Sequence, residues 1–384
     1  GDYGIVGFFA IKDNVCEHFL FSCRTLGMGI EQYTYNYLKR PVLKIVGDVV
    51  SNLSTTELPF WINKSMESAN KKGAEIKSRG EHKVLIKGPC DLFQIFPFIE
   101  KSECIDTEFT YVLDSGAVVE STAHTTHIVE ANILSDKQKE LIVNELPFMD
   151  LGAYNNNIYK LPYKVVVLSY LQDCNLGVYQ RKGTGEKFAF IEYTSDMTNP
   201  DNYEKLINQN CSTGGFNFTK EFLDSFSQKY EFLGRNTPDI ILENYKYIRS
   251  HLNSDTVMAI MLGVEIPYDM GDNAAYKDRH IIHKQTNDLL RNWAAETKNV
   301  ELINVNKYVK SSSDFYDHIN HFTKPVYYNL AKDIVEVINK NTDGSVKKYG
   351  KWKIAYMKLH DFVGNLLTKN RRKMGLKWKN RLKL

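Results

Sequence analysis

The sequence predicts an α/β protein in which a mainly parallel sheet lies between two layers of helices, and three observations support this prediction. Short, continuous apolar runs recur along residues 83–340, as they do in strands that are covered on both faces. Segments with helical periodicity separate these runs, and such alternation favours an open parallel sheet. Of the 384 residues, 43% are hydrophobic and 25% charged, which is ordinary for a protein with a buried core.

Two segments precede this region and differ from it. Residues 1–40 have the pattern of a small α+β segment, in which two paired strands lead into a helix. The strands are predicted at 4–11 and 15–23, and the helix at 30–38. Residues 41–82 are polar, show little periodicity and are predicted to be a connector. Because the chain has no initial Met and opens directly on a strand pattern, we expect it to be a piece of a longer polypeptide.

The region 83–340 contains five apolar runs of strand length and two well-marked helices. The predicted strands are 83–87, 109–113, 164–169, 256–262 and 300–305. The predicted helices, 238–252 and 324–338, carry apolar side chains at helical spacing, and each follows a Thr that suits the N-cap position. Residues 177–236 are rich in Gly, Asn, Ser and aromatic side chains, interrupt the alternation, and are predicted to be an insertion or a lid.

The charge of the chain is divided between an acidic body and a basic tail. Residues 341–384 carry 13 Lys and Arg against two Asp, although the net charge of the whole chain is only +3. Large apolar side chains, Trp352 and Trp378 among them, are interleaved with the basic ones, which is typical of segments that bind anionic membrane surfaces. A solvated tail is the alternative; co-sedimentation with anionic vesicles separates the two. The acidic body argues against nucleic acid as a partner.

The six cysteines include no C-x-x-C pair and no zinc-site spacing. In a chain of this length they indicate reduced thiols of a cytoplasmic protein. The sequence contains no apolar stretch of about 18 residues or more, so we expect no membrane-spanning helix. His124 and His127 are three positions apart, but no third ligand is near them in the sequence. We therefore expect these histidines to lie in an exposed loop and to hold no metal.

The residues that follow the predicted strands are the candidates for chemistry, because ligands of open α/β sheets bind at the carboxyl ends of the strands. Cys90 follows the first strand at a strand-to-helix turn, where the helix start favours the nucleophilic thiolate. Gly116 and Gln172 follow the next two strands, and His321 precedes the last helix. In this order the residues form a set suited to nucleophilic catalysis.

This ordered set resembles the SGNH (GDSL-like) hydrolase superfamily over about two thirds of the chain, residues 83–340. In that superfamily a Gly-Asp-Ser after the first strand supplies the nucleophile, a Gly and an Asn after the next two strands bind the oxyanion, and a late Asp-x-x-His supplies the base. The resemblance implies that Cys90 is the nucleophile, His321 the base and Asp317 the group that orients the base. It also implies that Gly116 and Gln172 bind the oxyanion. A three-layer sandwich and no required cofactor are expected for this domain.

Three residues depart from the superfamily pattern. Cysteine stands where serine is expected at position 90, glutamine where asparagine is expected at position 172, and His318 rather than an acid lies three residues before His321. Two functions therefore stay open. One is an acyl hydrolase or acyltransferase that acts on an ester or thioester of a glycan or a carrier-bound intermediate. The other is a catalytically inactive binding or scaffold module.

A second resemblance lies in residues 1–40. Arg24, Gly27 and Gly29 follow a predicted strand and open a helix, and their spacing resembles the pyrophosphate loop of the acetyltransferase-like (GNAT-fold) module that ends FkbH-like proteins. This resemblance implies a partial GNAT-like segment whose backbone amides bind coenzyme A or phosphopantetheine. A structural hairpin followed by a helix is the simpler alternative.

Together, the two resemblances imply a bacterial cytoplasmic protein of surface-polysaccharide synthesis, such as capsule formation. A glycan or an acyl carrier is the expected partner, and the basic tail would hold the protein at the inner face of the membrane. A third possibility is that the GNAT-like part, with sequence upstream of it, carries the chemistry.

Overall fold

In the computed structural model the chain forms two compact units. The larger unit comprises Gly1–Gly4 and Ser78–Lys347, and the smaller comprises Ile5–Lys77 and Lys348–Leu384. The structure describes residues 6–12, 15–21, 29–43, 53–54, 83–100, 102, 104–109, 111–113, 118–208, 216–268, 277–316, 321–344 and 346–347.

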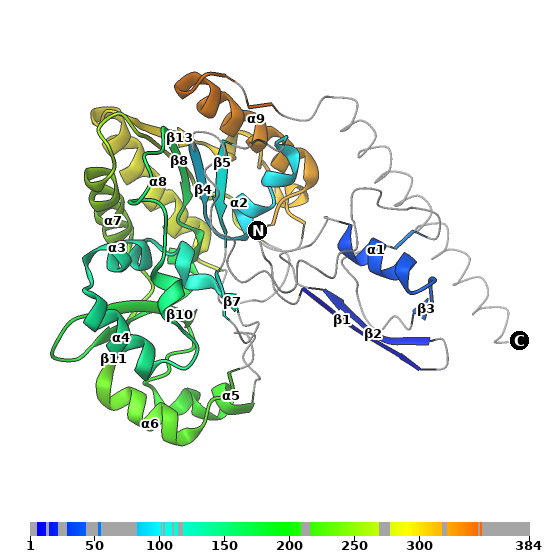
Figure 1. Cartoon of the computed structure of the whole chain (residues 1–384), viewed down its shortest axis with the longest axis vertical. Helices are drawn as coiled ribbons and strands as arrows, with labels where there is room; N and C mark the ends of the chain where they lie inside the picture. Colours follow the sequence, from blue (N-terminus) through cyan, green and yellow to red (C-terminus); the bar gives the residue numbers. More distant parts are fainter. Residues whose placement is uncertain are drawn as a thin grey trace, which may run out of the picture. The chain divides into compact units, whose positions relative to one another are not determined.

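The larger unit is built on a five-stranded sheet in which all the strands are parallel (Figure 1). In spatial order the strands are β13 (Val300–Ile303), β12 (Val257–Met261), β8 (Val165–Ser169), β4 (Val84–Lys87) and β5 (Ile105–Glu108). Every side chain of β4, β8 and β12 is buried, because helices cover both faces of these central strands. The predicted α/β class with a mainly parallel sheet is confirmed.

Helices lie on both faces of this sheet (Figure 1). On one face are α3 (Thr125–Ile133), α7 (Pro238–His251) and α8 (Arg279–Glu296), whose apolar side chains share one buried cluster with those of the strands. On the other face are α2 (Cys90–Phe93) and α9 (Lys324–Asn341). The Thr237 hydroxyl accepts a hydrogen bond from the backbone at the start of α7, as expected of an N-cap, whereas Thr323 stands at the N-cap of α9 without a side-chain bond.

One strand was predicted in the wrong place. The sequence predicts the second strand at 109–113, but the sheet strand is β5, which ends at Glu108. β5 lies at the edge of the sheet and all four of its side chains are half-buried, so it lacks the continuous apolar run that marks the other strands. Within the predicted range, Tyr111 and Val112 form β6, which pairs antiparallel with β7 (Val118–Val119).

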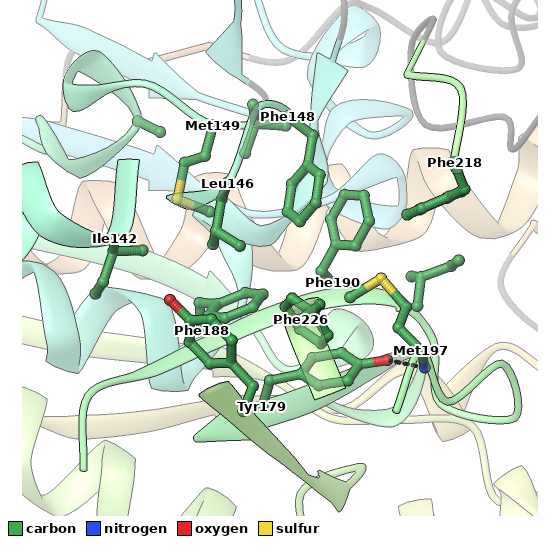
Figure 2. Packing of buried hydrophobic residues seen from close by; sticks show 14 of the residues in the cluster. Ile142, Leu146, Phe148, Met149, Tyr179, Phe188, Phe190, Met197, Phe218 and Phe226 are labelled. Carbon is green, nitrogen blue, oxygen red and sulfur yellow. Dashed lines mark hydrogen bonds between the residues drawn. The ribbon is translucent and has the colours of Figure 1, made fainter. Parts of the chain in front are cut away.

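The described part of residues 177–236 belongs to a second, antiparallel sheet with its own core. The sheet has the order β10 (Lys187–Glu192), β9 (Leu176–Arg181) and β11 (Tyr230–Gly234), and the core is shared by α4 (Asp136–Glu145), α5 (Tyr203–Asn208) and α6 (Lys220–Lys229). Figure 2 shows that this core is largely aromatic: Phe148 stacks on Phe190 with ring centroids 3.7 Å apart. The hydroxyl of Tyr179 accepts a hydrogen bond from the backbone nitrogen of Met197 at 3.1 Å.

The described residues of the smaller unit form a three-stranded sheet and one helix. Its elements are β1 (Gly7–Lys12), β2 (Val15–Phe21), α1 (Ile30–Tyr37) and β3 (Val42–Leu43). β1 and β2 form an antiparallel hairpin, and β3 pairs parallel to β2. Phe19 of the hairpin contacts Tyr35 of the helix, with ring centroids 6.2 Å apart. The predicted hairpin and helix are therefore confirmed.

Short 3-10 helices connect several of these elements. They are η3 (Phe96–Phe98), η4 (Glu120–Ala123), η5 (Leu151–Tyr154), η6 (Leu171–Cys174), η7 (Pro200–Asn202), η9 (Val305–Lys307) and η10 (Ser312–Asp314). Within the described ranges, no helix has both the length and the apolar character that crossing a bilayer requires.

Candidate active site at the carboxyl edge of the sheet

The strand order places a switch point between β4 and β8. From β4 the chain continues to β5 on one side of it, whereas β8 lies on the other side and leads on to β12 and β13. Loops that leave such neighbouring strands in opposite directions open a crevice at their carboxyl ends, where open α/β sheets bind ligands. The residues that follow β4 and end β8 are therefore the ones to inspect.

A small hollow lies at this edge. It is lined by four residues that have polar side-chain atoms and by apolar side chains and backbone from the ends of β8 and β12. The lining residues are Asp91, Ser169, Tyr170, Leu171, Met261, Leu262, Gly263, Val264, His283 and Phe322. The hollow thus combines mostly apolar walls with a few polar groups, as small-molecule sites do.

Asp91 and Ser169 meet in this hollow across the switch point. Asp91 lies on α2, directly after Cys90, and is 5% exposed. The hydroxyl of Ser169, the last residue of β8, donates a hydrogen bond to the Asp91 carboxylate. Burial raises the pKa of Asp91 to about 6, although the bond from Ser169 and the charge of His321 both lower it. A carboxyl group with such a pKa in a crevice is a candidate for acid–base chemistry.

His321 belongs to the same group of side chains. It is 4% exposed and lies in the segment before α9, where Phe315 and Phe322 form an isolated antiparallel bridge. Its backbone oxygen accepts a hydrogen bond from Tyr316 at 2.7 Å, which fixes the segment in place. Because the charge of His321 contributes to the pKa of Asp91, the two groups lie close enough to interact electrostatically.

A buried hydrogen-bond network holds the turn that follows β12, and this turn lines the hollow. The Tyr170 hydroxyl donates to Asn287 Oδ1 at 2.5 Å and accepts from the backbone nitrogen of Gly263 at 2.8 Å. Asn287 Nδ2 in turn donates to the Gly263 carbonyl at 2.8 Å. A Cβ atom at Gly263 would stand 2.5 Å from Cγ of His283 and 2.7 Å from the Tyr170 hydroxyl. Only glycine therefore lets α8 and β8 approach this turn so closely.

The structure places some of the residues predicted for the site and leaves others outside the described ranges. Cys90 begins α2 and is half-buried; it does not line the hollow itself but precedes Asp91, which does. Gln172 is buried on η6 and does not line the hollow; its amide nitrogen donates to Glu120 at 3.5 Å and its amide oxygen accepts from Asn175 at 3.3 Å. The predicted oxyanion donor is thus engaged in local hydrogen bonds.

Gly116 and Asp317 lie outside the described residues, as do Arg24 and Gly27. Gly29, from the predicted phosphate-binding loop, stands at the N-cap of α1 with φ of 77°, a left-handed conformation that favours glycine. This backbone requirement accounts for Gly29 without a ligand, so the proposed role in cofactor binding stays a prediction.

Three residues of the site were missed by the sequence interpretation: Asp91, Ser169 and His283. Asp91 could have been found, because it is the one carboxylate in an otherwise apolar run immediately after the first strand. Ser169 ends a buried strand, which is also readable from the sequence. No sequence signal identifies His283, because it lies on a helix 113 positions after the strand-end residue Tyr170 that it contacts.

The expectation of an exposed loop at His124 and His127 is wrong. Both side chains are buried, and they lie at the start of α3, where the His124 ring accepts a hydrogen bond from the backbone of Thr126 at 3.1 Å. The His127 ring donates to the carbonyl of Ala153 at 2.8 Å. Both histidines thus serve packing, and the described part of the chain contains no cluster of three or more His, Cys, Asp or Glu that could hold a metal ion.

Asp173, which follows Gln172, supports the same helix start. Its carboxylate accepts hydrogen bonds from the Thr125 backbone at 3.1 Å and from Asn236 Nδ2 at 2.7 Å, and the Thr125 hydroxyl donates to it as well. Asp173 is fully buried. This network fixes the segment after β8 against the start of α3.

Comparison with known proteins does not extend this description. No model of a protein family matches the sequence, and no curated protein is significantly similar to it.

Proposed function

We propose that the chain is an SGNH-like acyl hydrolase or acyltransferase that acts on an ester or thioester of a glycan or a carrier-bound intermediate. The observation that carries the proposal is the buried carboxylate of Asp91, which follows Cys90 in the chain, accepts a hydrogen bond from Ser169 at the switch point and lies within electrostatic reach of His321. A thiol, an imidazole and a carboxylate are the three groups that nucleophilic acyl transfer uses.

In the proposed reaction the Cys90 sulfur attacks the acyl carbonyl carbon while His321 takes the thiol proton. The tetrahedral intermediate then collapses, the bond to the leaving oxygen or sulfur breaks, and His321 returns the proton to that atom. Water or an acceptor hydroxyl next attacks the acyl-Cys90 thioester with His321 as the base, and the thiol is restored. Asp91 stabilises the protonated imidazole, which is the role that the resemblance gives to Asp317.

The rival proposal is a binding module without catalytic activity, and one observation favours it. The side chain of Gln172 is bonded to Glu120 and Asn175 and does not line the hollow, where an oxyanion donor would be needed. In this case the hollow binds a ligand, Cys90 is a packing residue, and the protein acts as a scaffold in a larger assembly.

The biological setting belongs to the proposal as well. A bacterial cytoplasmic protein of surface-polysaccharide synthesis would meet both glycan and carrier-bound acyl groups. Binding of coenzyme A or phosphopantetheine at Arg24, Gly27 and Gly29, and contact of the basic tail with an anionic membrane, are parts of this proposal that rest on the sequence alone.

Turnover of small acyl substrates separates the two proposals. We expect the full chain to cleave 4-nitrophenyl acetate or S-acetyl-N-acetylcysteamine, and we expect Cys90→Ala to lower kcat/KM at least about 10³-fold, because the nucleophile is lost. Cys104→Ala is the matched control: Cys104 is also half-buried, but it lies just before β5 at the opposite edge of the sheet, and its loss should change kcat/KM less than about twofold. Turnover that persists in a folded Cys90→Ala protein would exclude the thiol mechanism.

A further inference from the structure

One ring nitrogen of His283 has no hydrogen-bond partner among the residues that the structure describes. The residue lies on α8, lines the hollow and is 2% exposed. Its Nδ1 lies 2.9 Å from the backbone oxygen of Val264. Because a carbonyl oxygen can only accept, Nδ1 carries the ring hydrogen. Burial lowers the pKa of His283 to about 3, so the ring is neutral near pH 7 and Nε2 offers a lone pair.

Cationic neighbours disfavour a second proton on the ring, because the charges of Arg279, one turn earlier on α8, and of Arg235 help burial to lower the pKa of His283. Nε2 is buried and has no hydrogen-bond partner among the described residues. The nearby walls of the hollow are apolar, formed by Met261, Leu262, Val264 and Phe322. The hydroxyl of Ser169, a donor on the lining, is directed to Asp91. A buried acceptor left unpaired destabilises the fold, and native sites satisfy such groups with a ligand or with water.

We propose that His283 Nε2 accepts a hydrogen bond from a hydroxyl group of the ligand and thereby selects hydroxylated ligands over analogues that lack the hydroxyl. The inference rests on the proposed function only in taking the hollow to be the substrate site. A hydroxyl is the donor that both proposed substrate classes offer, since it can belong to a hydroxyacyl group or to a sugar. In this proposal the apolar walls contact the carbon skeleton of the ligand, and Nε2 recognises its hydroxyl through the hydrogen bond.

The test measures binding rather than turnover, in the full chain carrying Cys90→Ala, so that it does not depend on catalysis. The acyl probes are methyl butyrate, methyl 3-hydroxybutyrate and methyl 3-methoxybutyrate, and the sugar probe is methyl glucoside. Saturation-transfer NMR with titration gives the Kd values. We expect at least one hydroxylated probe to bind. If methyl 3-hydroxybutyrate binds, its Kd should be about tenfold lower than the Kd values of the deoxy and methoxy analogues, because neither analogue can donate a hydrogen bond at that position. Which probe binds identifies the source of the hydroxyl.

Two variants assign the selectivity to Nε2. His283→Asn keeps an amide nitrogen that can donate to the Val264 carbonyl but removes the acceptor, so binding of the hydroxylated probe should weaken about tenfold. His127→Gln is the matched control, since His127 is equally buried and also bonds a backbone carbonyl, but it does not line the hollow. This control should change no Kd by more than about twofold.

The proposal is overturned if neither hydroxylated probe binds, if the deoxy analogue binds as well as the hydroxyl compound, or if a folded His283→Asn protein binds the hydroxylated probe as tightly as its parent. Should His283→Asn not fold, His283→Phe and the methoxy analogue in the parent chain provide the same comparison. Selective binding of a hydroxylated probe without any turnover of acyl substrates would uphold the role of His283 and reject the acyl-transfer proposal. Turnover of acyl substrates without selective binding would uphold the acyl-transfer proposal and reject the role of His283.

Discussion

Asp91 combines burial, a hydroxyl partner and a neighbouring histidine. Burying a carboxylate is costly because the charged form loses its hydration, and the hydrogen bonds from the Ser169 side chain and the Leu92 backbone offset only part of this cost. The result is a pKa of about 6, so the ionised and neutral forms exchange near the pH at which enzymes work. A residue that served stability alone would be better replaced by a neutral side chain of the same shape.

Replacing Asp91 by asparagine should therefore stabilise the fold and impair the chemistry. Because burial raises the pKa of Asp91 from 3.8 to about 6, the stability that its neutral form provides is complete below about pH 4 and is lost as the pH rises to about 6. Asp91→Asn stays neutral and should exceed the parent in unfolding free energy by ~1–3 kcal/mol at pH 7.5 and equal it near pH 4. Urea unfolding at the two pH values measures this difference.

The same variant should lower kcat/KM about tenfold or more, because the imidazolium of His321 loses its carboxylate. An Asp91→Asn protein that is less stable than the parent at both pH values would show that the carboxylate serves the fold, and would contradict the catalytic role.

At the scale of elements, the turn after β12 is held by hydrogen bonds from α8 and from the end of β8. The Tyr170 hydroxyl connects all three, since it bonds the Gly263 backbone and the Asn287 side chain. Tyr245 on α7 lies in the same buried cluster, yet its hydroxyl has no hydrogen-bond partner among the described residues. The two tyrosines form a natural pair for measuring what the network contributes.

We expect Tyr170→Phe to lower the unfolding free energy by ~1–3 kcal/mol, because the substitution leaves the Gly263 nitrogen and the Asn287 oxygen with one partner fewer in a buried site. Tyr245→Phe removes a hydroxyl that is already unpaired and should be neutral or slightly stabilising. Denaturant unfolding of both variants at the same pH gives the comparison. Equal losses in the two would mean that the network does not hold the turn.

The elements differ in how far the sequence alone could predict them. Strands β4, β8 and β12 were predicted because burial on both faces requires continuous apolar side chains. The edge strand β5 escaped prediction because its alternate side chains face polar surroundings, as Asp106 does in accepting a hydrogen bond from Tyr163. The aromatic core around Phe148 and Phe190 also carries no simple period, since it is assembled from several separate segments.

On the scale of the whole molecule, the candidate site joins residues that are far apart in the chain. Cys90 and His321 were predicted because each adjoins an element with a strong pattern. Asp91 meets Ser169 because β4 and β8 are neighbours in the sheet, and it interacts electrostatically with His321, which precedes α9. The spacing of these residues in the sequence predicts neither interaction. The larger unit also includes Val346, which is buried and exchanges two hydrogen bonds with Asn339 at the end of α9.

The membrane hypothesis for the tail is affected by this packing. Residues 348–384 lie outside the described residues, so contact with an anionic membrane stays a prediction. Because Val346 is buried and the Lys347 carbonyl accepts a hydrogen bond from the Glu100 backbone nitrogen, a truncated chain that tests this hypothesis should end after Lys347 rather than within α9. Removal of Val346 would open the core beside α9 and confuse loss of the tail with loss of stability.

The central claim, that Cys90 forms a covalent acyl intermediate assisted by His321, is tested most directly by trapping that intermediate. The full chain is mixed with S-acetyl-N-acetylcysteamine, quenched in acid within seconds and analysed as peptides by mass spectrometry. We predict one acetyl group on the peptide that contains Cys90, its absence in His321→Ala, and no comparable label on Cys104, which has similar exposure. An unmodified Cys90, or acetylation spread equally over Cys90 and Cys104 and unchanged in His321→Ala, would contradict the claim.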